Sequence, residues 1–282
     1  MPDDLRPSPI AGRWYPGDAA SLARLVDDYL AQAPPPAAAA RVVGVLAPHA
    51  GLLYSGPVAA HAFQWVRGQA FEVVVILSPS HFHADGPVLT SAHAAYTTPL
   101  GAVPVDQPLL AQIRARLAAA LNTPAAAALP ALAYDREHAI EMELPFLQRV
   151  LAPGFQLAPL MLREQTAPVA AALGALLGEL LAGRRALLVV SSDLSHYYPQ
   201  AEAERLDQAL LAPVAAFDPA AVLAVHAAGR GYACGAGALA AGLWAAGALG
   251  AHSARVVGYA TSGAVSGDYA AVVGYAAAVF LA

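Results

Sequence analysis

The sequence predicts an α/β fold, with a mostly parallel central sheet that carries helices on both faces. Two observations predict this fold. Several runs, such as VVGVLA at 42–47 and EVVVILS at 72–78, are continuously apolar, as in strands that are buried on both faces. Longer stretches of helical character separate these runs, which is the order of repeated strand–helix units. We therefore expect one α/β domain over residues 1–282.

Each expected strand is a short run rich in Val, Leu or Ile. Segment 96–105, YTTPLGAVPV, contains proline and glycine between apolar residues, so we expect a hairpin or edge strands there. The other expected strands are 42–47, 72–78, 155–162, 186–192, 254–262 and 269–280.

The expected helices lie between these strands. The first is expected to begin at Pro57, because proline fits the first turn of a helix. The alanine- and proline-rich stretches 33–40 and 122–131 are low in complexity and are expected to be surface connections. The expected helices are 57–67, 107–121, 138–151, 166–182, 200–216, 219–228 and 235–249.

Composition excludes several classes of partner. The chain has a net charge of −5 and no cluster of five basic residues, so nothing favours nucleic acid or an anionic membrane. Segment 231–251 carries no charge, but it is mostly Ala and Gly, which favours a buried helix over a membrane span. We expect neither nucleic acid nor a membrane as a partner.

The N-terminus and the cysteine count indicate the compartment. MPDDLRPSP is polar and broken by proline, so it lacks the basic region and apolar run of a secretion signal. The single cysteine excludes an internal disulfide and fits a reducing compartment. We therefore expect the protein in the cytoplasm.

Three of the expected strands lead directly to proton-active side chains. His49 follows VVGVLAP, His81 follows VVVILSPS, and Asp193 and His196 follow LLVVSS. In a sheet of this kind, ligands bind outside the carboxyl ends of the strands. We therefore expect these four side chains to face one crevice.

The single cysteine extends this group. Cys234 lies next to Gly235, where a helix is expected to begin, and a thiol near a helix N-terminus is expected to have a lowered pKa. His49, His81 and Cys234 would then form a metal site of two imidazoles and one thiolate, with Asp193 and His196 behind it and His196 able to act as a base. The alternative is structural, because lone histidines are often loop residues and a lone cysteine is often a small buried hydrophobe.

Segment 136–147, REHAIEMELPFL, concentrates further charged residues at the start of an expected helix. His138 and Glu141 are three residues apart and share a helical face. They are either a wall of the same pocket or part of a solvated, capped helix that turns its leucines inward.

At these positions the chain resembles the MEMO-like family. The resemblance rests on AGRWYPGD, APHAGLLYSG, LSPSH, EHAIEMELP, SSDLSH and ACG, which occur in this order and span nearly the whole chain. Bacterial and archaeal members are often called system protein B of the AmmeMemoRadiSam gene cluster, which implies radical-SAM cluster proteins as partners. The family is similar in fold to class III extradiol dioxygenases of the LigB type, which use non-haem iron(II).

The resemblance also implies roles for single residues. His49, His81 and Cys234 match the family's metal-ligand positions, and Asp193 and His196 match its other pocket residues. The dioxygenases have a carboxylate as third ligand, whereas the thiolate of Cys234 shifts the preference toward copper(I) or zinc and alters the redox behaviour of iron.

Two aromatic residues are assigned to the pocket by the resemblance alone. Trp14 and Tyr54 match positions that line a groove implicated in phosphopeptide binding in the human member. In this chain they are expected either to bind a peptide or to form the pocket rim.

Three functions follow as hypotheses. The chain is a metal-dependent oxidoreductase with dioxygenase-like chemistry on a small molecule, in which Asp193 and His196 are catalytic and the metal is iron(II) or copper(I). Alternatively, it binds iron, copper or zinc without turnover and handles the metal. As a third hypothesis, it is an interaction module that works with its gene-cluster partners.

Overall fold

The computed structural model describes residues 4–36 and 40–282. Residues 1–3 and 37–39, the latter within the connection expected over 33–40, lie outside the described residues. The strands are β1 (Leu5–Arg6), β2 (Val42–Ala47), β3 (Val73–Pro79), β4 (Val88–Ser91), β5 (Ala95–Thr98), β6 (Gly101–Pro104), β7 (Ala131–Leu132), β8 (Gln156–Leu162), β9 (Ala186–Ser191), β10 (His196–Tyr198), β11 (Ser253–Thr261) and β12 (Val272–Leu281). The helices are α1 (Ala19–Gln32), α2 (Leu52–Phe63), α3 (Gln107–Leu121), α4 (Ala125–Ala128), α5 (Ala139–Val150), α6 (Ala167–Leu181), α7 (Gln200–Ala215), α8 (Pro219–Ala227), α9 (Ala236–Ala248) and α10 (Gly263–Ser266), with a 3₁₀ turn at Gln64–Val66.

The central sheet confirms the α/β fold, and it is mixed rather than purely parallel. Its order within the described residues is β10-β12-β2-β9-β3-β8-β4-β7, with β11 also paired to β12. Strands β2, β9, β3 and β8 run parallel, whereas β12 joins β2 and β4 joins β8 in antiparallel pairs. The apolar runs of the sequence form the parallel centre, whose strands are buried on both faces.

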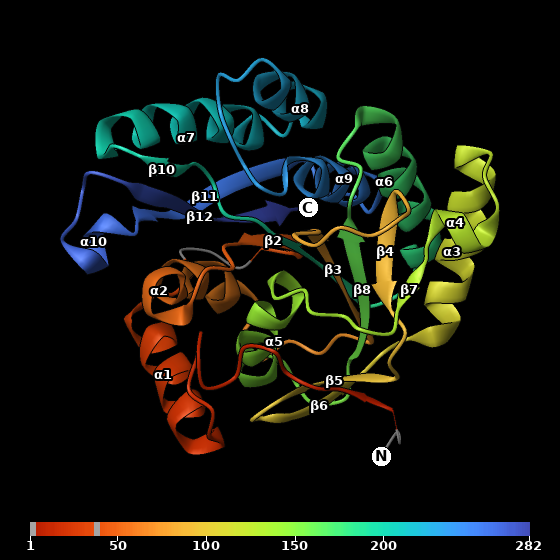
Figure 1. Ribbon diagram of the computed structural model, residues 1–282, viewed down its shortest axis with the longest axis horizontal. Helices are drawn as coiled ribbons and strands as arrows, with labels where there is room; N and C mark the ends of the chain where they lie inside the picture. The colour runs from red at the N-terminus through yellow and green to blue at the C-terminus, as the bar shows by residue number, and fades with distance from the viewer. Residues whose placement is uncertain (1–3, 37–39) are drawn as a thin grey trace.

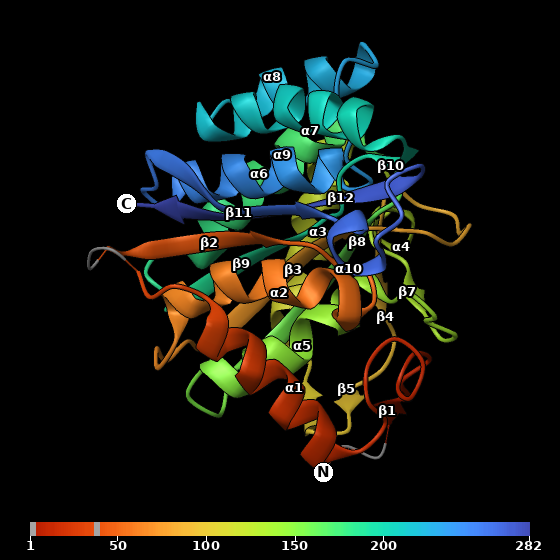
Figure 2. The same ribbon diagram turned by 90° about the vertical axis from the view of Figure 1, so that its left-hand side faces the viewer.

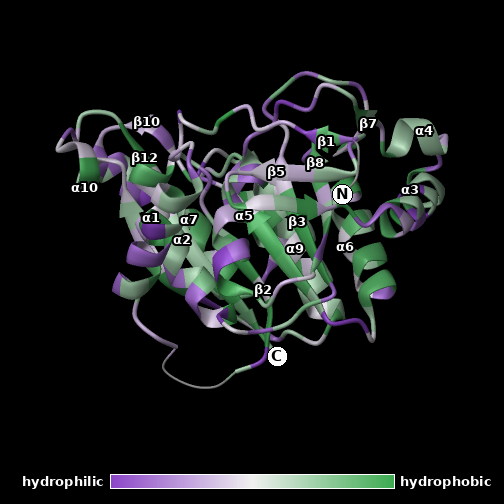
Figure 3. Ribbon diagram, turned by 90° about the horizontal axis from the view of Figure 1, so that it is seen from below, coloured by the Kyte–Doolittle hydropathy of each residue, from purple (hydrophilic) through white to green (hydrophobic). Residues whose placement is uncertain are grey.

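Helices cover both faces of the sheet, as the alternation of strands and helices predicts. On one face lie α6, α7, α8 and α9, and on the other lie α1, α2 and α5 (Figure 1 and Figure 2). The strands in the centre are hydrophobic, whereas hydrophilic residues are concentrated in the loops and on the outer turns of the helices (Figure 3). A smaller sheet of β1, β5 and β6 contains the hairpin expected over 96–105.

The uncharged segment expected over 235–249 is helix α9, which is buried between the sheet and α6. A Cβ atom at Gly174 of α6 would come within 2.5 Å of the Cβ atom of Trp244, and one at Gly178 within 2.3 Å of that of Ala248. The small residues of both helices therefore permit a close approach. Among the described residues, no helix combines the length and the apolar character that crossing a membrane requires.

Several elements differ from the sequence-based expectation. Helix α2 begins at Leu52 rather than at Pro57, which lies inside the helix. Helix α1 was not predicted, although Asp18 caps it by accepting a hydrogen bond from the backbone N–H of Ser21 at 2.8 Å. The stretch 122–131, expected to be a connection, includes the short helix α4 and the start of β7.

A buried arginine attaches the N-terminal segment to the start of α5. The Arg6 side chain is fully buried and its Nε donates to the Asp135 carboxylate at 2.8 Å, while its other nitrogens donate to the Glu141 carboxylate and the Glu137 carbonyl. Tyr96 also donates to Asp135, at 2.6 Å. The segment that leads to the pocket is therefore held by charge-assisted hydrogen bonds.

We expect Arg6→Met to destabilise the protein strongly, because it leaves the buried carboxylates of Asp135 and Glu141 without their cation. The expected loss in the free energy of unfolding is about 3–5 kcal/mol, measured by chemical denaturation. In the matched control Arg205→Met, the lost pair with Glu202 is exposed, and little change is expected. Equal effects of the two substitutions would contradict the assignment.

Candidate metal centre

A pocket of about 540 Å³ lies at the carboxyl ends of the parallel strands. It is lined by side chains from the loops after β2, β3 and β9, as the strand-end argument predicts. Of the residues singled out from the sequence, the structure places these in the lining: Trp14, His49, Tyr54, His81, His138, Asp193 and His196.

Three potential ligands converge beside this pocket. The ligand atoms of His49, His81 and Cys234 all lie within 4.8 Å of one another. Cys234 Sγ lies 3.3 Å from His49 Nε2, and the rings of His49 and His81 meet edge to face with centroids 5.2 Å apart. Since bonds to zinc from His and Cys are roughly 2.0–2.3 Å long, this spacing is compatible with one shared ion.

His49 is held in the form that can bind a metal. Its Nδ1 lies 2.8 Å from the hydroxyl of Ser191, whose oxygen also lies 2.6 Å from Glu143 Oε1 and 2.8 Å from the carbonyl of Ala139. If Nδ1 donates to Ser191, then Nε2 keeps its lone pair and faces Cys234. Burial, together with the charge of His81, lowers the pKa of His49 to about 3, so the imidazole stays neutral.

His81 is oriented by Glu137, which lies at the start of α5. Its Nδ1 is 2.9 Å from Glu137 Oε1, and its backbone N–H donates to Oε2 of the same carboxylate at 2.6 Å. Burial disfavours a charged His81, but the hydrogen bond to Glu137 outweighs this effect and raises the pKa of His81. Burial opposes ionisation of Glu137 too, yet its hydrogen bond with His81 and the other contacts lower its pKa to about 2. This contact leaves Nε2 of His81 as the free ligand atom.

Glu137, with His81 and His138, forms a second group whose ligand atoms lie within 4.8 Å of one another. However, Glu137 Oε1 also accepts the backbone N–H groups of His138 and Ala139, at 2.8 and 3.0 Å. Because these bonds occupy the carboxylate, its geometry suits an orienting partner of His81 rather than a ligand.

Cys234 is seated by a close approach of two backbone segments. A Cβ atom at Gly235 would come within 3.0 Å of the Ser192 side chain, and the backbone N–H of Gly235 donates to Ser192 Oγ at 2.9 Å. The backbone N–H of Cys234 donates to the Asp193 carbonyl at 3.2 Å, and that of Asp193 lies 3.3 Å from Sγ. Glycine at 235 thus lets the thiol reach the end of β9.

The expectation of a lowered thiol pKa is wrong for the protein without metal. Burial raises the pKa of Cys234, and the nearby Asp193 carboxylate raises it further. These effects outweigh the hydrogen bonds of the thiol with Ser192 and with the backbone N–H of Asp193, which act to lower its pKa. A metal cation supplies the missing positive charge and removes the proton from a coordinating thiol, so the donor set fits a metal that displaces a proton on binding.

Asp193 and His196 complete the polar wall of the pocket. The Asp193 carboxylate accepts the backbone N–H of His49 at 2.8 Å, and burial raises its pKa to about 6. Nδ1 of His196 lies 2.8 Å from the Leu194 carbonyl, to which it can only donate, so Nε2 is free to take or return a proton. Tyr197 follows at the pocket rim with φ of 64°, in the left-handed region that side chains seldom adopt.

His138, Trp14 and Tyr54 form the aromatic side of the pocket. The rings of Trp14 and His138 have centroids 4.4 Å apart, and the ring of His138 stacks on that of His81 at 4.5 Å. Burial, together with the neighbouring imidazole of His49, lowers the pKa of His138 to about 3. Tyr54 lies on α2 and is 39% exposed, so part of its ring is open to solvent at the mouth.

Glu141 is not part of the pocket lining, which was one of the two alternatives for it. Its side chain is fully buried, and its carboxylate accepts hydrogen bonds from Arg6, Ser8 and Tyr15. His138 and Glu141 do share a helical face, but the N-terminal segment covers this face at Glu141.

Sequence reasoning assigned no separate role to three polar residues that support the site: Glu137, Glu143 and Ser191. Glu137 and Glu143 stand in the charged segment 136–147, and Ser191 ends β9. Their proximity in the sequence to His138 and Asp193 is the signal that could have found them. Their hydrogen-bond partners come from other elements.

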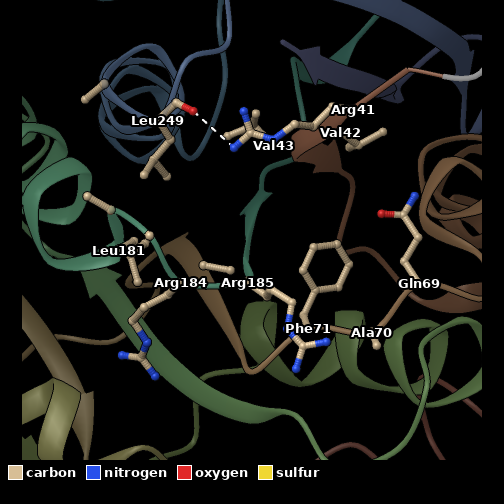
Figure 4. Close-up of a pocket in the computed structure, with 14 residues that line it drawn as sticks. Arg41, Val42, Val43, Gln69, Ala70, Phe71, Leu181, Arg184, Arg185 and Leu249 are labelled. Atoms are coloured by element: carbon tan, nitrogen blue, oxygen red, sulfur yellow. Dashed lines mark hydrogen bonds between the residues drawn. The ribbon is translucent and has the colours of Figure 1, made fainter.

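A second hollow, of about 560 Å³, lies at the opposite ends of the parallel strands and holds no histidine or cysteine in its lining. Figure 4 shows Arg41 reaching across it to the carbonyl of Leu249, at 3.3 Å. Its other arginines, Arg184 and Arg185, are paired with carboxylates of neighbouring elements. The chemistry-bearing residues are therefore concentrated at the carboxyl-end pocket.

We expect Glu143→Gln to remove a pH dependence from the stability of the chelator-treated protein. Burial raises the pKa of Glu143 well above its usual 4.5, so above pH 4.5 the folded state keeps a proton that the unfolded state loses. Stability therefore falls as pH rises in that window, by up to about 1.4 kcal/mol per unit. The uncharged variant lacks this fall.

The measurement is the free energy of unfolding of both proteins between pH 5 and 8. The difference in favour of Glu143→Gln should widen as pH rises, whereas the exposed control Glu179→Gln should show no such trend. A difference that is constant with pH would show that Glu143 is ionised in the folded protein.

The chain is similar to known proteins over nearly its whole length. Residues 6–279 match the family model described as "Memo-like protein". A "MEMO1 family protein" from Nitrosopumilus maritimus is 32% identical over 261 residues, which cover 91% of this chain and 92% of that protein. A second, from Methanothermobacter thermautotrophicus, is 34% identical over 266 residues, covering 91% and 93%. A third, from Methanopyrus kandleri, is 32% identical over 262 residues, covering 89% and 90%. The chain belongs to the Memo-like protein family.

Proposed function

We propose that this protein binds one redox-active metal ion, iron(II) or copper(I), through His49, His81 and Cys234. The observation that carries the proposal is the convergence of two imidazole nitrogens and a sulfur within 4.8 Å of one another. Neutral imidazole and thiolate together are a donor set for iron, copper and zinc.

We further propose that the pocket performs oxidoreductase chemistry on a small molecule. When bound, the metal would supply electron transfer and Lewis acidity. His196 supports this reading because its free Nε2 can hold or return a proton, and the pocket of about 540 Å³ leaves room for a ligand in front of the imidazoles. Asp193 fixes the loop of His49 through the backbone N–H, and Trp14 and Tyr54 line one side of the pocket.

A second candidate is metal handling without turnover, and Cys234 is the observation that favours it. A soft sulfur 3.3 Å from a neutral imidazole suits copper(I), which prefers thiolate ligands. Oxygen uptake with small phenolic substrates by the iron- or copper-loaded protein would favour the oxidoreductase. Metal exchange to a competing chelator without any oxygen uptake would favour handling.

Variants of the three proposed ligands test the metal site. We expect Cys234→Ser and His49→Gln to lose iron and copper, as measured by elemental analysis of protein purified without added metal. The control is His252→Ala, since His252 is exposed and lies outside the pocket. Thermal unfolding in chelator shows whether each variant folds. Full metal retention by folded Cys234→Ser and His49→Gln would overturn the proposal.

Replacement of Glu137, whose carboxylate orients His81, tests the hydrogen bonds that support the proposed metal ligands. We expect Glu137→Gln to weaken metal affinity by about 10–100-fold, because the imidazole of His81 loses its charged hydrogen-bond partner. Competition with a coloured chelator measures the affinity, and the exposed Glu179→Gln is the matched control. An unchanged affinity in a folded Glu137→Gln protein would remove His81 from the ligand set or Glu137 from its support.

A further inference from the structure

A third hollow, the adjoining hollow, opens next to the metal-site pocket lined by His49 and His81 and shares part of its wall. Its volume is about 440 Å³, and Arg13, Trp14 and His138 line both hollows. Phe82 and Arg136 belong to the adjoining hollow alone. Each hollow is within the range of about 300–1,000 Å³ that is typical for small ligands, so one ligand can extend from one into the other.

The adjoining hollow is cationic in a chain whose net charge is −5. Arg13 and Arg136 are exposed, and within residues 4–36 and 40–282 neither forms an ion pair, unlike six other arginines of this part. No acidic residue lines this hollow. Two guanidinium groups without carboxylate partners therefore face the same space.

The surroundings keep these guanidinium groups available for a ligand. Arg136 lies over the ring of Phe82, with its Cζ atom 5.1 Å from the ring centroid. Stacking of this kind occupies the face of the guanidinium and leaves its N–H edge free for a carboxylate or phosphate. Apolar Pro9 and Ile10 complete the wall and offer no competing hydrogen-bond acceptor from their side chains.

The charges of the two hollows give a bound ligand a direction. Asp193 lines the metal-site pocket but not the adjoining hollow, so an anionic group is disfavoured near Asp193 and favoured near Arg13 and Arg136. The rings of Trp14 and His138 lie between the two regions as a shared wall.

We propose that the pocket takes a small organic anion whose carboxylate or phosphate lies between Arg13 and Arg136. Its uncharged end extends past Trp14 and His138 toward His49, His81 and Cys234. The chemistry at that end rests on the proposed function, whereas binding of the anion stands on the two arginines alone.

The test uses the full-length, chelator-treated protein, so that no metal contributes to binding. Calorimetry measures the Kd of benzoate, of phenyl phosphate and of uncharged benzamide. Because hydrogen bonds to charged groups are stronger than those to neutral groups, we expect at least one of the two anions to bind about 10-fold or more tightly than benzamide. The order of the two anions identifies the preferred head group. Benzamide binding as tightly as both anions would overturn the proposal.

Substitution of the arginines locates the site. We expect Arg13→Gln and Arg136→Gln each to weaken anion binding by about 10-fold and to leave benzamide binding unchanged. The control Arg116→Gln, on α3 and outside both hollows, should bind the anion as the unaltered protein does. Because both arginine side chains are exposed, their substitution does not threaten the fold. Unchanged anion binding by Arg13→Gln and Arg136→Gln would refute the site.

Metal retention by the same variants separates this inference from the proposed function. Arg13→Gln and Arg136→Gln are expected to retain metal as the unaltered protein does, since neither contacts the proposed ligands. Loss of anion binding with normal metal retention supports the anion site. An unaltered protein that binds anions through these arginines but retains no metal would refute the proposed metal site and leave the anion site in place.

Discussion

The register of the parallel strands is the constraint on which the whole site depends. Ala47 of β2 lies opposite Ser191 of β9, so His49 and Asp193 each follow two residues later and come to the same edge of the sheet. The hydrogen bond from the backbone N–H of His49 to the Asp193 carboxylate is the direct result. A slip of one residue would turn every side chain of the strand to the other face and separate this pair.

The electrostatic arrangement at that edge suits a cation that is bound together with loss of a proton. His49 is neutral, the thiol of Cys234 holds its proton, and the carboxylates of Glu137 and Asp193 lie close by. Without a cation these negative groups raise the thiol pKa, whereas a bound cation lowers it and favours the thiolate. The same burial that disfavours a free thiolate thus strengthens its attraction to a metal.

The N-terminal segment connects the buried network to the mouth of the pocket. Arg6 and Tyr15 bind the Glu141 carboxylate, and the backbone carbonyl of Trp14 accepts the N–H of Leu52 at the start of α2. Trp14 and Arg13 therefore line the pocket on a segment that these hydrogen bonds hold on both sides. The shape of the pocket depends on buried ion pairs that lie outside it.

The sequence by itself determined the α/β class, most of the strands and helices, and the strand ends at which His49, His81 and Asp193 stand. These features follow from local periodicity and from the rule that parallel strands present their carboxyl ends together. Helix α1 had a local signal in its Asp18 cap, whereas the start of α2 before Pro57 did not follow from the proline rule. Only the tertiary structure decided that Glu137 supports His81 and that Glu141 turns to Arg6 instead of the pocket. The physical reason is that hydrogen bonds between distant segments, and the pKa values that burial sets, depend on which groups approach in space, and no local pattern of residues encodes that approach.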